Sequence, residues 1–244
     1  MNTSSPFKEG LIDGIPIGLG YLFVSFGFGI SVVNAGLSTL IAVIMSATNV
    51  TSAGQMAGLI VLVEHGTLLE MILTQFIINL RYSLMGITLS QRIDQSFTTP
   101  KRLLLSFFIT DEIFAVSSTK NRKVGAVYFS GLSVFPYIGW TLGTLLGAVA
   151  GQILPSLLTN CMNILIYGMF IAIIIPPAKK EKGVLFGLLL AISLSCLFYF
   201  LPLFHFISSG FSVIISAVIS SAVVALFFPV VPDPKTSQRE EGET

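Results

Sequence analysis

The chain has 244 residues, of which 53% are hydrophobic and only 10% are charged, and its mean hydropathy is +0.88. Soluble domains carry about 25% charged residues, so this composition excludes a water-soluble globular protein. The formal net charge of +1, with no basic stripe to neutralise phosphates, argues against nucleic acid as a partner.

The apolar stretches divide at their Gly, Pro and polar breaks into about eight segments, and a helix that spans a bilayer needs about 20 apolar residues. The segments are 14–33, 39–63, 67–90, 103–118, 124–150, 157–175, 183–203 and 206–228. The loops between them are short. We therefore expect one all-α, polytopic transmembrane helical bundle over residues 1–232 and a disordered cytoplasmic tail over residues 233–244.

The first segment, 14–33, follows the sequence MNTSSPFKEG. That start lacks the basic region, short apolar core and small-residue cleavage site of a signal peptide, so we expect the segment to stay as a membrane anchor. Asp13 is expected at the interfacial end of this helix. Gly14-Ile-Pro16 resembles Val134-Phe-Pro136 of the fifth segment, a weak indication of an inverted repeat.

The second segment, 39–63, carries a polar run in its middle. Six hydrogen-bonding side chains fall within ten residues: Ser46, Thr48, Asn49, Thr51, Ser52 and Gln55. Such groups are unsatisfied against lipid, so the run predicts a broken or re-entrant helix that is enclosed by protein or lines a water-filled cavity. The alternative is that these groups only hydrogen-bond between helices, at about 0.6 kcal/mol per contact.

The third segment, 67–90, contains Arg81 with mostly apolar residues on both sides. An arginine there costs about 2.5–3.5 kcal/mol on insertion scales, so it needs a partner. On a regular helix Glu70 shares the stripe of Arg81, whereas Asn79 falls on the opposite half. This predicts a helix enclosed on both polar sides, with Glu70 reaching to the membrane interface.

The fourth segment, 103–118, holds Thr110-Asp111-Glu112 between apolar runs. We expect the two carboxylates to be the counter-charges of Arg81. A carboxylate within the membrane is also where a proton is taken up and released. A purely structural salt bridge is the alternative.

Basic residues predict the topology, because Lys and Arg mark the cytoplasmic side in short loops. The basic groups are Lys8; Arg92, Lys101 and Arg102; Lys120, Arg122 and Lys123; Lys179, Lys180 and Lys182; and Lys235. Both groups that flank 103–118 are cytoplasmic if that segment and 39–63 do not cross. The pattern favours six crossings with two re-entrant or broken segments and cytoplasmic termini, with eight ordinary crossings as the alternative.

Catalytic and metal-binding patterns are missing from the sequence. The two histidines, His65 and His205, lie near segment ends, and the cysteines, Cys161 and Cys196, lie within apolar segments. We expect packed, reduced thiols, no metal site, no cofactor and no enzymatic activity.

The order of these polar patches resembles the AzlC family, the large subunit of branched-chain amino acid exporters. The resemblance is carried by Gly14-Ile-Pro16, Gly20-Tyr21, Ser25-Phe-Gly-Phe-Gly29, Ala35-Gly-Leu-Ser38, the run from Ser46 to Gln55, Asn79-Leu-Arg81-Tyr82 and Thr110-Asp111-Glu112. The resemblance is strong over about residues 7–155. After that, only the hydropathy pattern is similar. Two departures concern the substrate: Thr51-Ser52 stands in a motif that usually has Ala-Gly, and Tyr82 stands where the family often has His.

The resemblance implies a fold of broken membrane helices and a small AzlD-like membrane subunit as partner. It also implies efflux of leucine, isoleucine, valine or related apolar amino acids across a bacterial inner membrane, driven by protons.

From these patches we expect a substrate site formed by Ser46, Asn49, Thr51, Ser52, Gln55 and Asn79. Arg81, Asp111 and Glu112 are expected to form a charge relay that couples transport to protons. Two other functions remain open at this point: a channel or uniporter, and a membrane assembly subunit that transports nothing.

Overall fold

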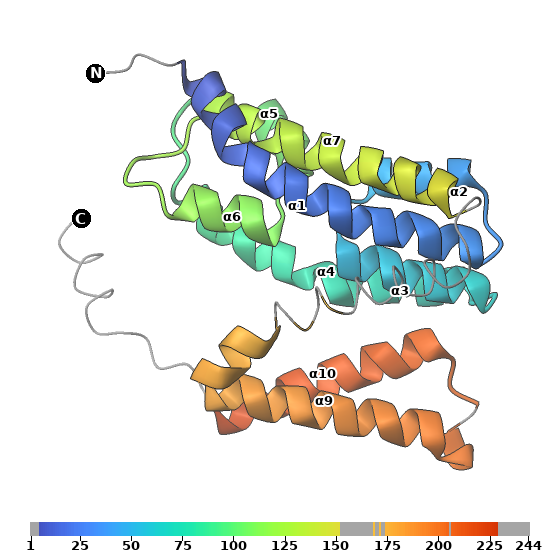
Figure 1. Cartoon of the computed structure of the whole chain (residues 1–244). Coiled ribbons are helices and arrows are strands. Elements are labelled where there is room, and N and C mark those ends of the chain that lie inside the picture. The colour runs from blue at the N-terminus through green and yellow to red at the C-terminus, as the bar shows by residue number, and fades with distance from the viewer. Residues whose placement is uncertain (1–4, 152–167, 169–170, 172–173, 205, 229–244) are drawn as a thin grey trace. The chain divides into compact units, whose positions relative to one another are not determined.

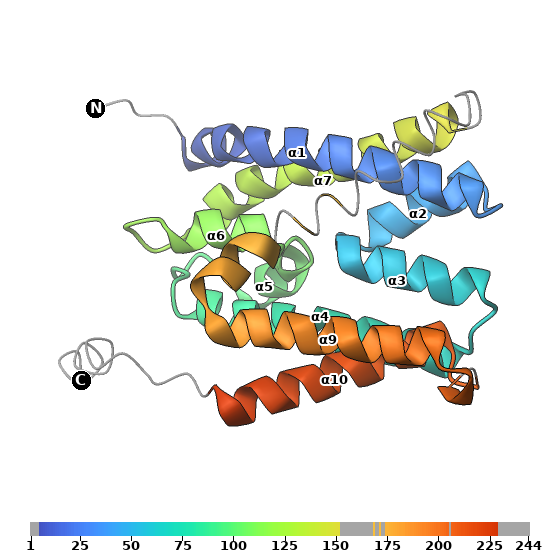
Figure 2. The same cartoon turned by 60° about the horizontal axis from the view of Figure 1, so that its bottom comes forward.

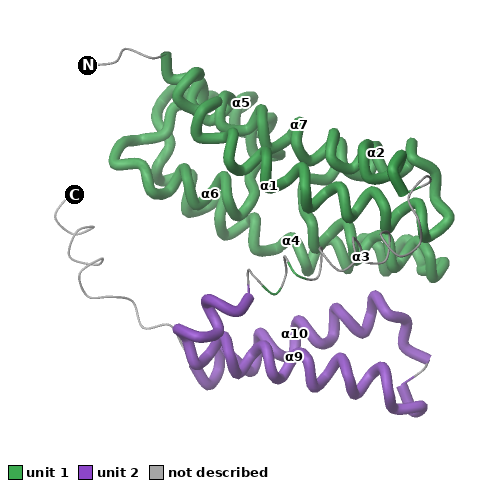
Figure 3. The backbone as a smooth tube through the Cα atoms, viewed as in Figure 1, with its two compact units in different colours: residues 1–171 green, residues 172–244 purple. Residues whose placement is uncertain are grey.

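The computed structural model describes residues 5–151, 168, 171, 174–204 and 206–228. Over these residues the fold is all-α, as the sequence predicts, apart from one isolated bridge between Ile93 and Val124. The chain divides into two compact units, Met1–Ile171 and Ala172–Thr244 (Figure 3), which are described separately. Five of the described helices are long and apolar enough to cross a membrane.

Three of these long helices form the frame of the first unit: α1 (Pro6–Asn34), α4 (Leu68–Ser90) and α7 (Ala126–Ala150) (Figure 1). α1 begins at Pro6, earlier than hydropathy predicts, so Glu9 and Asp13 lie inside the helix. Proline favours the first turn of a helix, and both carboxylates find basic partners at this end of the unit. Glu9 and Asp13, which mark the region before residue 14 as outside the apolar segment, are therefore compatible with the helix.

α1 and α7 lie side by side in parallel over most of their length (Figures 1 and 2). A methyl group built on Gly10 would lie 2.1 Å from the carbonyl oxygen of Tyr128, and one built on Gly29 would lie 2.1 Å from that of Thr144. Both residue numbers rise together along the contact, so the helices run in the same direction. Glycines thus let the two backbones touch, as in closely packed membrane helices.

The second predicted segment is broken in the structure into α2 (Thr39–Thr48) and α3 (Ser52–Val63). Residues 49–51 are extended between them, and the Thr51 side chain accepts a hydrogen bond from the Gly54 N–H to begin α3. Each half measures about 15–18 Å, roughly half of the hydrocarbon thickness. α2 approaches the middle of the unit and α3 returns to the same end (Figures 1 and 2).

The fourth predicted segment is broken in the same way, into α5 (Thr99–Ser106) and α6 (Asp111–Ser118). Each half is about 12 Å long. The Thr110 side chain accepts a hydrogen bond from the Ile113 N–H and begins α6, as Thr51 begins α3. The two broken segments enter the first unit from opposite ends (Figure 1).

One end of the first unit, here called the basic end, carries all of the unit's described Lys and Arg residues except Arg81. They are Lys8, Arg92, Lys101, Arg102, Lys120, Arg122 and Lys123. Because 103–118 leaves this end and returns to it, both of its flanking basic groups lie together, linked by the Arg92 hydrogen bond to the Ser118 carbonyl (2.6 Å). The described residues therefore have the re-entrant form and not the form with eight ordinary crossings.

The sequence similarity between Gly14-Ile-Pro16 and Val134-Phe-Pro136 does not mark an inverted repeat. An inverted repeat reverses the direction of equivalent helices, whereas α1 and α7 are parallel. The two broken segments are the elements that enter from opposite ends.

The second unit is a helical hairpin of α9 (Lys182–Phe200) and α10 (Ser209–Phe227), joined through the 3-10 turn η1 (Pro202–Phe204) and preceded by a helical stretch at 174–180. Cys196 is a free thiol on α9, and it is exposed within the second unit, where a packed thiol was expected. Most of segment 157–175, Cys161, His205 and the tail over residues 233–244 lie outside the described residues. A single domain over residues 1–232 stays a prediction.

Candidate functional site

Polar side chains gather where the two broken segments meet, between two apolar clusters of the first unit. One apolar cluster lies at the basic end and includes Leu89, Phe129 and Leu132, and the other lies at the opposite end and includes Phe28 and Val32. The polar side chains between them form what we call the central polar cluster. Its members are Tyr21, Ser46, Asn49, Gln55, Gln75, Asn79, Arg81, Asp111, Glu112, Trp140 and Thr144.

Aromatic rings join the tips of the broken segments. Tyr137 of α7 donates a hydrogen bond to the carbonyl oxygen of Ala47 (3.1 Å), at the end of α2. The same ring packs edge-on against Phe107 and Phe108 in the break between α5 and α6. One residue of α7 thus contacts both tips.

The first part of the cluster is a fully buried hydrogen-bond chain. Gln55 accepts from the Trp140 indole N–H (2.9 Å) and donates to the Ser46 hydroxyl (2.9 Å), which in turn shares a hydrogen bond with the Thr144 hydroxyl (2.7 Å). Each of these side chains is at most 3% exposed. For Ser46 and Gln55 the geometry favours the interhelical role that the sequence left as an alternative.

The second part is a row of amides between α2, α3 and α4. The Gln75 carbonyl oxygen accepts from Asn79 (3.2 Å) and Asn49 (3.4 Å), while its amide nitrogen donates to the Gly54 carbonyl (2.8 Å). Among the described residues, the buried Asn79 side-chain oxygen has no hydrogen-bond partner. An acceptor is therefore available beside the tip of the first broken segment.

The third part consists of two neighbouring carboxylates with different partners. Asp111 forms an ion pair with Arg81 (2.9 Å), so the pairing predicted from the sequence is present. Glu112 accepts a hydrogen bond from the hydroxyl of Tyr21 on α1. Arg81 also donates to the Tyr82 hydroxyl (3.1 Å), and its Nε has no partner within the described part of the chain. One carboxylate thus faces a cation and the other a neutral phenol.

Of the residues expected to bind substrate, Asn49, Gln55 and Asn79 lie in the cluster with Ser46. Thr51 is buried and Ser52 half-buried at the start of α3. Sequence reasoning missed four members of the cluster: Tyr21, Gln75, Trp140 and Thr144. Trp140 is the single tryptophan of the chain, a weak signal, and nothing in the sequence links Tyr21 to Glu112.

The expectation for Glu70 is wrong. Its side chain was expected to reach the membrane interface, yet Glu70 is only 3% exposed. It occupies the first turn of α4, where the Thr67 hydroxyl accepts from its backbone N–H (3.2 Å). This Thr-x-x-Glu spacing is that of a capping box, and a carboxylate is favoured at a helix N-terminus.

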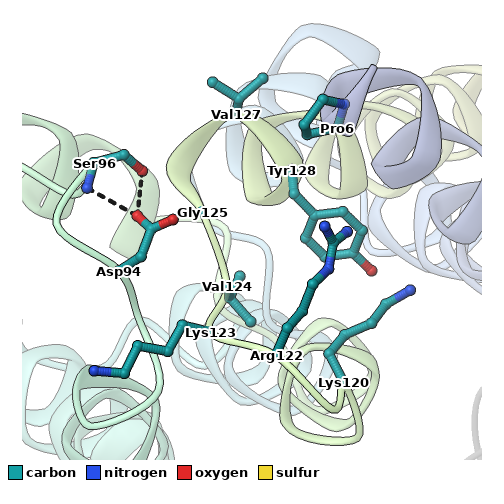
Figure 4. Close-up of a pocket in the computed structure, with 10 residues that line it drawn as sticks. All are labelled: Pro6, Asp94, Ser96, Lys120, Arg122, Lys123, Val124, Gly125, Val127 and Tyr128. Atoms are coloured by element: carbon teal, nitrogen blue, oxygen red, sulfur yellow. Dashed lines mark hydrogen bonds between the residues drawn. The ribbon is translucent and has the colours of Figure 1, made fainter. Parts of the chain in front are cut away.

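A second charged group lies at the basic end, apart from the central polar cluster. Lys120 forms ion pairs with Glu9 (3.0 Å) and Asp13 (2.7 Å) of α1, and Arg122 also contacts Glu9. Both basic side chains lie beside the Tyr128 ring, at the edge of a pocket of about 230 Å³ (Figure 4). These contacts fasten the chain after α6 to α1 and α7.

Two groups in the loops at this end, Lys120 and Asp94, have shifted pKa values. Burial lowers the pKa of Lys120, but its hydrogen bonds to Asp13 and Glu9 outweigh burial and raise the pKa above its ordinary value. Hydrogen bonds from the Ser96 hydroxyl and backbone N–H lower the pKa of Asp94. The Ser96 hydroxyl also accepts from the Ala126 N–H (2.8 Å) at the start of α7.

Comparison with known proteins places the chain among membrane proteins. The family model described as AzlC protein matches residues 16–154. The inner membrane protein YgaZ of Escherichia coli is 31% identical over 61% of this chain and 62% of its own length. An uncharacterized membrane protein of Archaeoglobus fulgidus is 30% identical over 73% of this chain and 79% of its own length. The branched-chain amino acid transport protein AzlC of Bacillus subtilis is 24% identical over 72% of this chain and 69% of its own length. No solved structure matches the chain.

Proposed function

The chain belongs to the AzlC family, and from that membership we propose that it exports branched-chain or related apolar amino acids by proton-coupled alternating access. The family places it among membrane transport proteins, and the Bacillus relative is named for branched-chain amino acid transport. A small AzlD-like membrane subunit, the outward direction, the proton coupling and the bacterial inner membrane belong to the proposal. So does the absence of enzymatic activity. The observation that carries the proposal is the central polar cluster, where two broken segments meet from opposite ends.

The tip of the first broken segment supports binding of an amino acid. Broken helices in transporters direct half-helix N-termini at anionic substrate groups. α6 has Asp111 and Glu112 in its own first turn, whereas α3 has no acidic residue in its first turn. The start of α3, near Thr51 and Ser52, is therefore the better place for the substrate carboxylate.

The ammonium group of the substrate needs hydrogen-bond acceptors. The side-chain oxygen of Asn79, which no described residue hydrogen-bonds, is one such acceptor, and the Asn79 side chain lies beside Gly54 of α3. Asn49 belongs to the same row of amides. In this proposal Ser46 and Gln55 hold α2, α3 and α7 in place around the substrate and do not touch it.

The two carboxylates support different roles in the relay. Arg81 balances the charge of Asp111, so protonating Asp111 would leave a cation within the membrane without a counter-charge. Glu112 accepts a hydrogen bond from the neutral hydroxyl of Tyr21 and makes no ion pair with a described residue, so protonating it leaves no described cation without its counter-charge. We therefore assign the exchanged proton to Glu112 and the balancing of Arg81 to Asp111.

The test is efflux of preloaded radiolabelled leucine from cells that express the chain. Efflux is measured with and without the proposed small AzlD-like subunit, at two external pH values. Saturable, pH-dependent efflux that requires both chains is the expected result. Efflux without saturation or pH dependence would indicate a channel or uniporter, and no efflux under any condition would overturn the transport of leucine.

Glu112→Gln is the matching variant, and it should abolish the pH dependence while the protein stays in the membrane. Glu64→Gln makes the same chemical change at an exposed position at the other end of the unit and should leave efflux intact. Full pH-driven efflux by Glu112→Gln would contradict the assignment of the proton to Glu112. It would leave the proposed substrate unaffected.

A further inference from the structure

Two adjoining pockets at the basic end differ in character. The first, of about 180 Å³, lies among apolar side chains that include Leu89, Phe97, Leu105 and Phe129. The second, of about 530 Å³, lies among polar and charged side chains that include Asp94, Ser96, Arg102 and Lys123. Ser90, Ile93 and Arg102 line both pockets, so the two lie side by side.

Arg102 is fixed at the boundary between the two pockets. Its Nε donates to the carbonyl oxygen of Phe97 (3.0 Å). Its two terminal nitrogens make no hydrogen bond to any described residue, so they are available for an anion. Arginine binds phosphate oxygens through two parallel N–H groups, which gives it geometric specificity for phosphates.

Other charges make the polar pocket attractive to an anion. Lys123 lines this pocket, and its side chain points away from Tyr128 (Figure 4). Asp94 is the acidic group there, but its carboxylate accepts hydrogen bonds from the Ser96 hydroxyl and N–H. The two cations on this wall therefore outnumber the single carboxylate, which is already engaged.

The apolar pocket favours a lipid over a free phosphate as the bound anion. A free phosphate gains nothing from a space lined by leucine and phenylalanine, whereas a lipid places an acyl chain there. Gly86 of α4 lines this pocket, and a methyl group built on Gly86 meets no atom within 4 Å. The helix thus leaves room at the point where a chain from the bilayer would enter.

We propose that the adjoining pockets are a binding site for one anionic phospholipid of the leaflet at the basic end. The phosphate lies against Arg102 and Lys123, and part of one acyl chain lies between the end of α4 and α5. Basic pockets between membrane helices on the cytoplasmic side recognise anionic head groups in this way. The site is separate from the central polar cluster and does not depend on the proposed transport.

The test is native mass spectrometry of the purified full chain in an uncharged detergent, titrated with phosphatidylglycerol, phosphatidylcholine or inorganic phosphate. Phosphatidylglycerol should bind with a stoichiometry of one and more tightly than phosphatidylcholine. Equal binding of the two lipids, or equal binding of inorganic phosphate, would overturn the proposal.

Two variants separate the head-group and acyl-chain contacts. Arg102→Gln should weaken phosphatidylglycerol binding about tenfold, the loss expected for a charge-assisted hydrogen bond. Lys8→Gln removes the same charge from an exposed position at the same end and should bind as the parent chain does. Equal affinities of the two variants would contradict the site.

Gly86→Leu should fill the apolar pocket and reduce binding of phosphatidylglycerol about as strongly, while leucine favours the helix over glycine. Gly20→Leu is the matched control, because Gly20 also has open space but lines neither pocket. Circular dichroism of the lipid-free variants should show unchanged helix content, so a loss of binding would not reflect unfolding. Unchanged binding by Gly86→Leu would overturn the acyl-chain part of the proposal.

Discussion

At the scale of single residues, Asp111 and Glu112 are neighbours in the sequence but lie in two different environments. Sequence reasoning paired both carboxylates with Arg81, because they are the acidic residues of the neighbouring apolar segment. Only Asp111 makes that ion pair, since Glu112 is one position further along α6 and faces Tyr21 of α1. That contact joins residues far apart in the chain, so no local pattern predicts it.

Tyr21→Phe removes the hydroxyl that holds Glu112 and keeps the ring that packs edge-on against Trp140. A hydrogen bond to a charged group contributes about 1.5–3 kcal/mol. We expect proton-driven leucine efflux to fall about tenfold with unchanged amounts of protein in the membrane.

Tyr199→Phe is the control, because Tyr199 is exposed on the second unit. If both variants lose efflux equally, or if Tyr21→Phe loses none, the Tyr21 hydroxyl does not position Glu112.

Gln55→Leu distinguishes the two roles that the sequence left open for the polar run. If Gln55 holds helices together, its loss leaves the Trp140 N–H unpaired and lowers the stability by about 1–3 kcal/mol, with little change in the KM of leucine efflux. Thermal unfolding in detergent and KM measure the two effects. Gln91→Leu, at an exposed position past α4, should change neither, and a raised KM with unchanged stability would instead place Gln55 in the substrate site.

At the scale of elements, the breaks were predictable and their contacts were not. The polar run 46–55 predicts the break before α3, because six polar side chains cannot face lipid. The basic groups on both sides predict that 103–118 returns to the same end. The caps at Thr51 and Thr110 follow helix-start chemistry, but the meeting of both tips at Tyr137 depends on the packing of α7.

The parallel contact of α1 and α7 gives a prediction at this scale. A methyl group built on Gly147 would lie 1.9 Å from the carbonyl oxygen of Phe26, so Gly147→Ala must push the helices apart. We expect a loss of stability of about 1–3 kcal/mol, measured by thermal unfolding.

Gly20→Ala is the matched control, because its added methyl group meets nothing within 4 Å. It should stabilise α1 by about 1 kcal/mol, the difference between alanine and glycine in a helix. A Gly147→Ala protein as stable as Gly20→Ala would contradict the close contact.

At the scale of the whole molecule, the contacts at the basic end predict how stability depends on pH. The raised pKa of Lys120 stabilises the fold below the unfolded value of about 10.4, and this contribution is lost as pH rises through the folded pKa. The lowered pKa of Asp94 stabilises the fold above about 3.9, and this contribution is lost as pH falls through the folded pKa. Neither group titrates between about pH 5 and 9.

Thermal unfolding against pH checks this expectation with Lys120→Gln beside the parent chain. The variant should be less stable by at most about 1 kcal/mol near neutral pH, because the pair is partly exposed. Its stability should also fall less above about pH 10 than that of the parent chain. A parent and variant that lose stability in parallel at alkaline pH would show that another group causes the loss.

The short half-helices also have an electrical consequence. Because the breaks of both broken segments lie near the middle of α1, α4 and α7, a charge that reaches the central polar cluster from either side has crossed about half of the membrane. Half of the transmembrane voltage corresponds to about 1.2 kcal/mol per elementary charge for each 100 mV. The voltage therefore acts with similar strength on both approaches to Glu112. An ion that arrives at Glu112 and an ion that leaves it both move through part of the voltage.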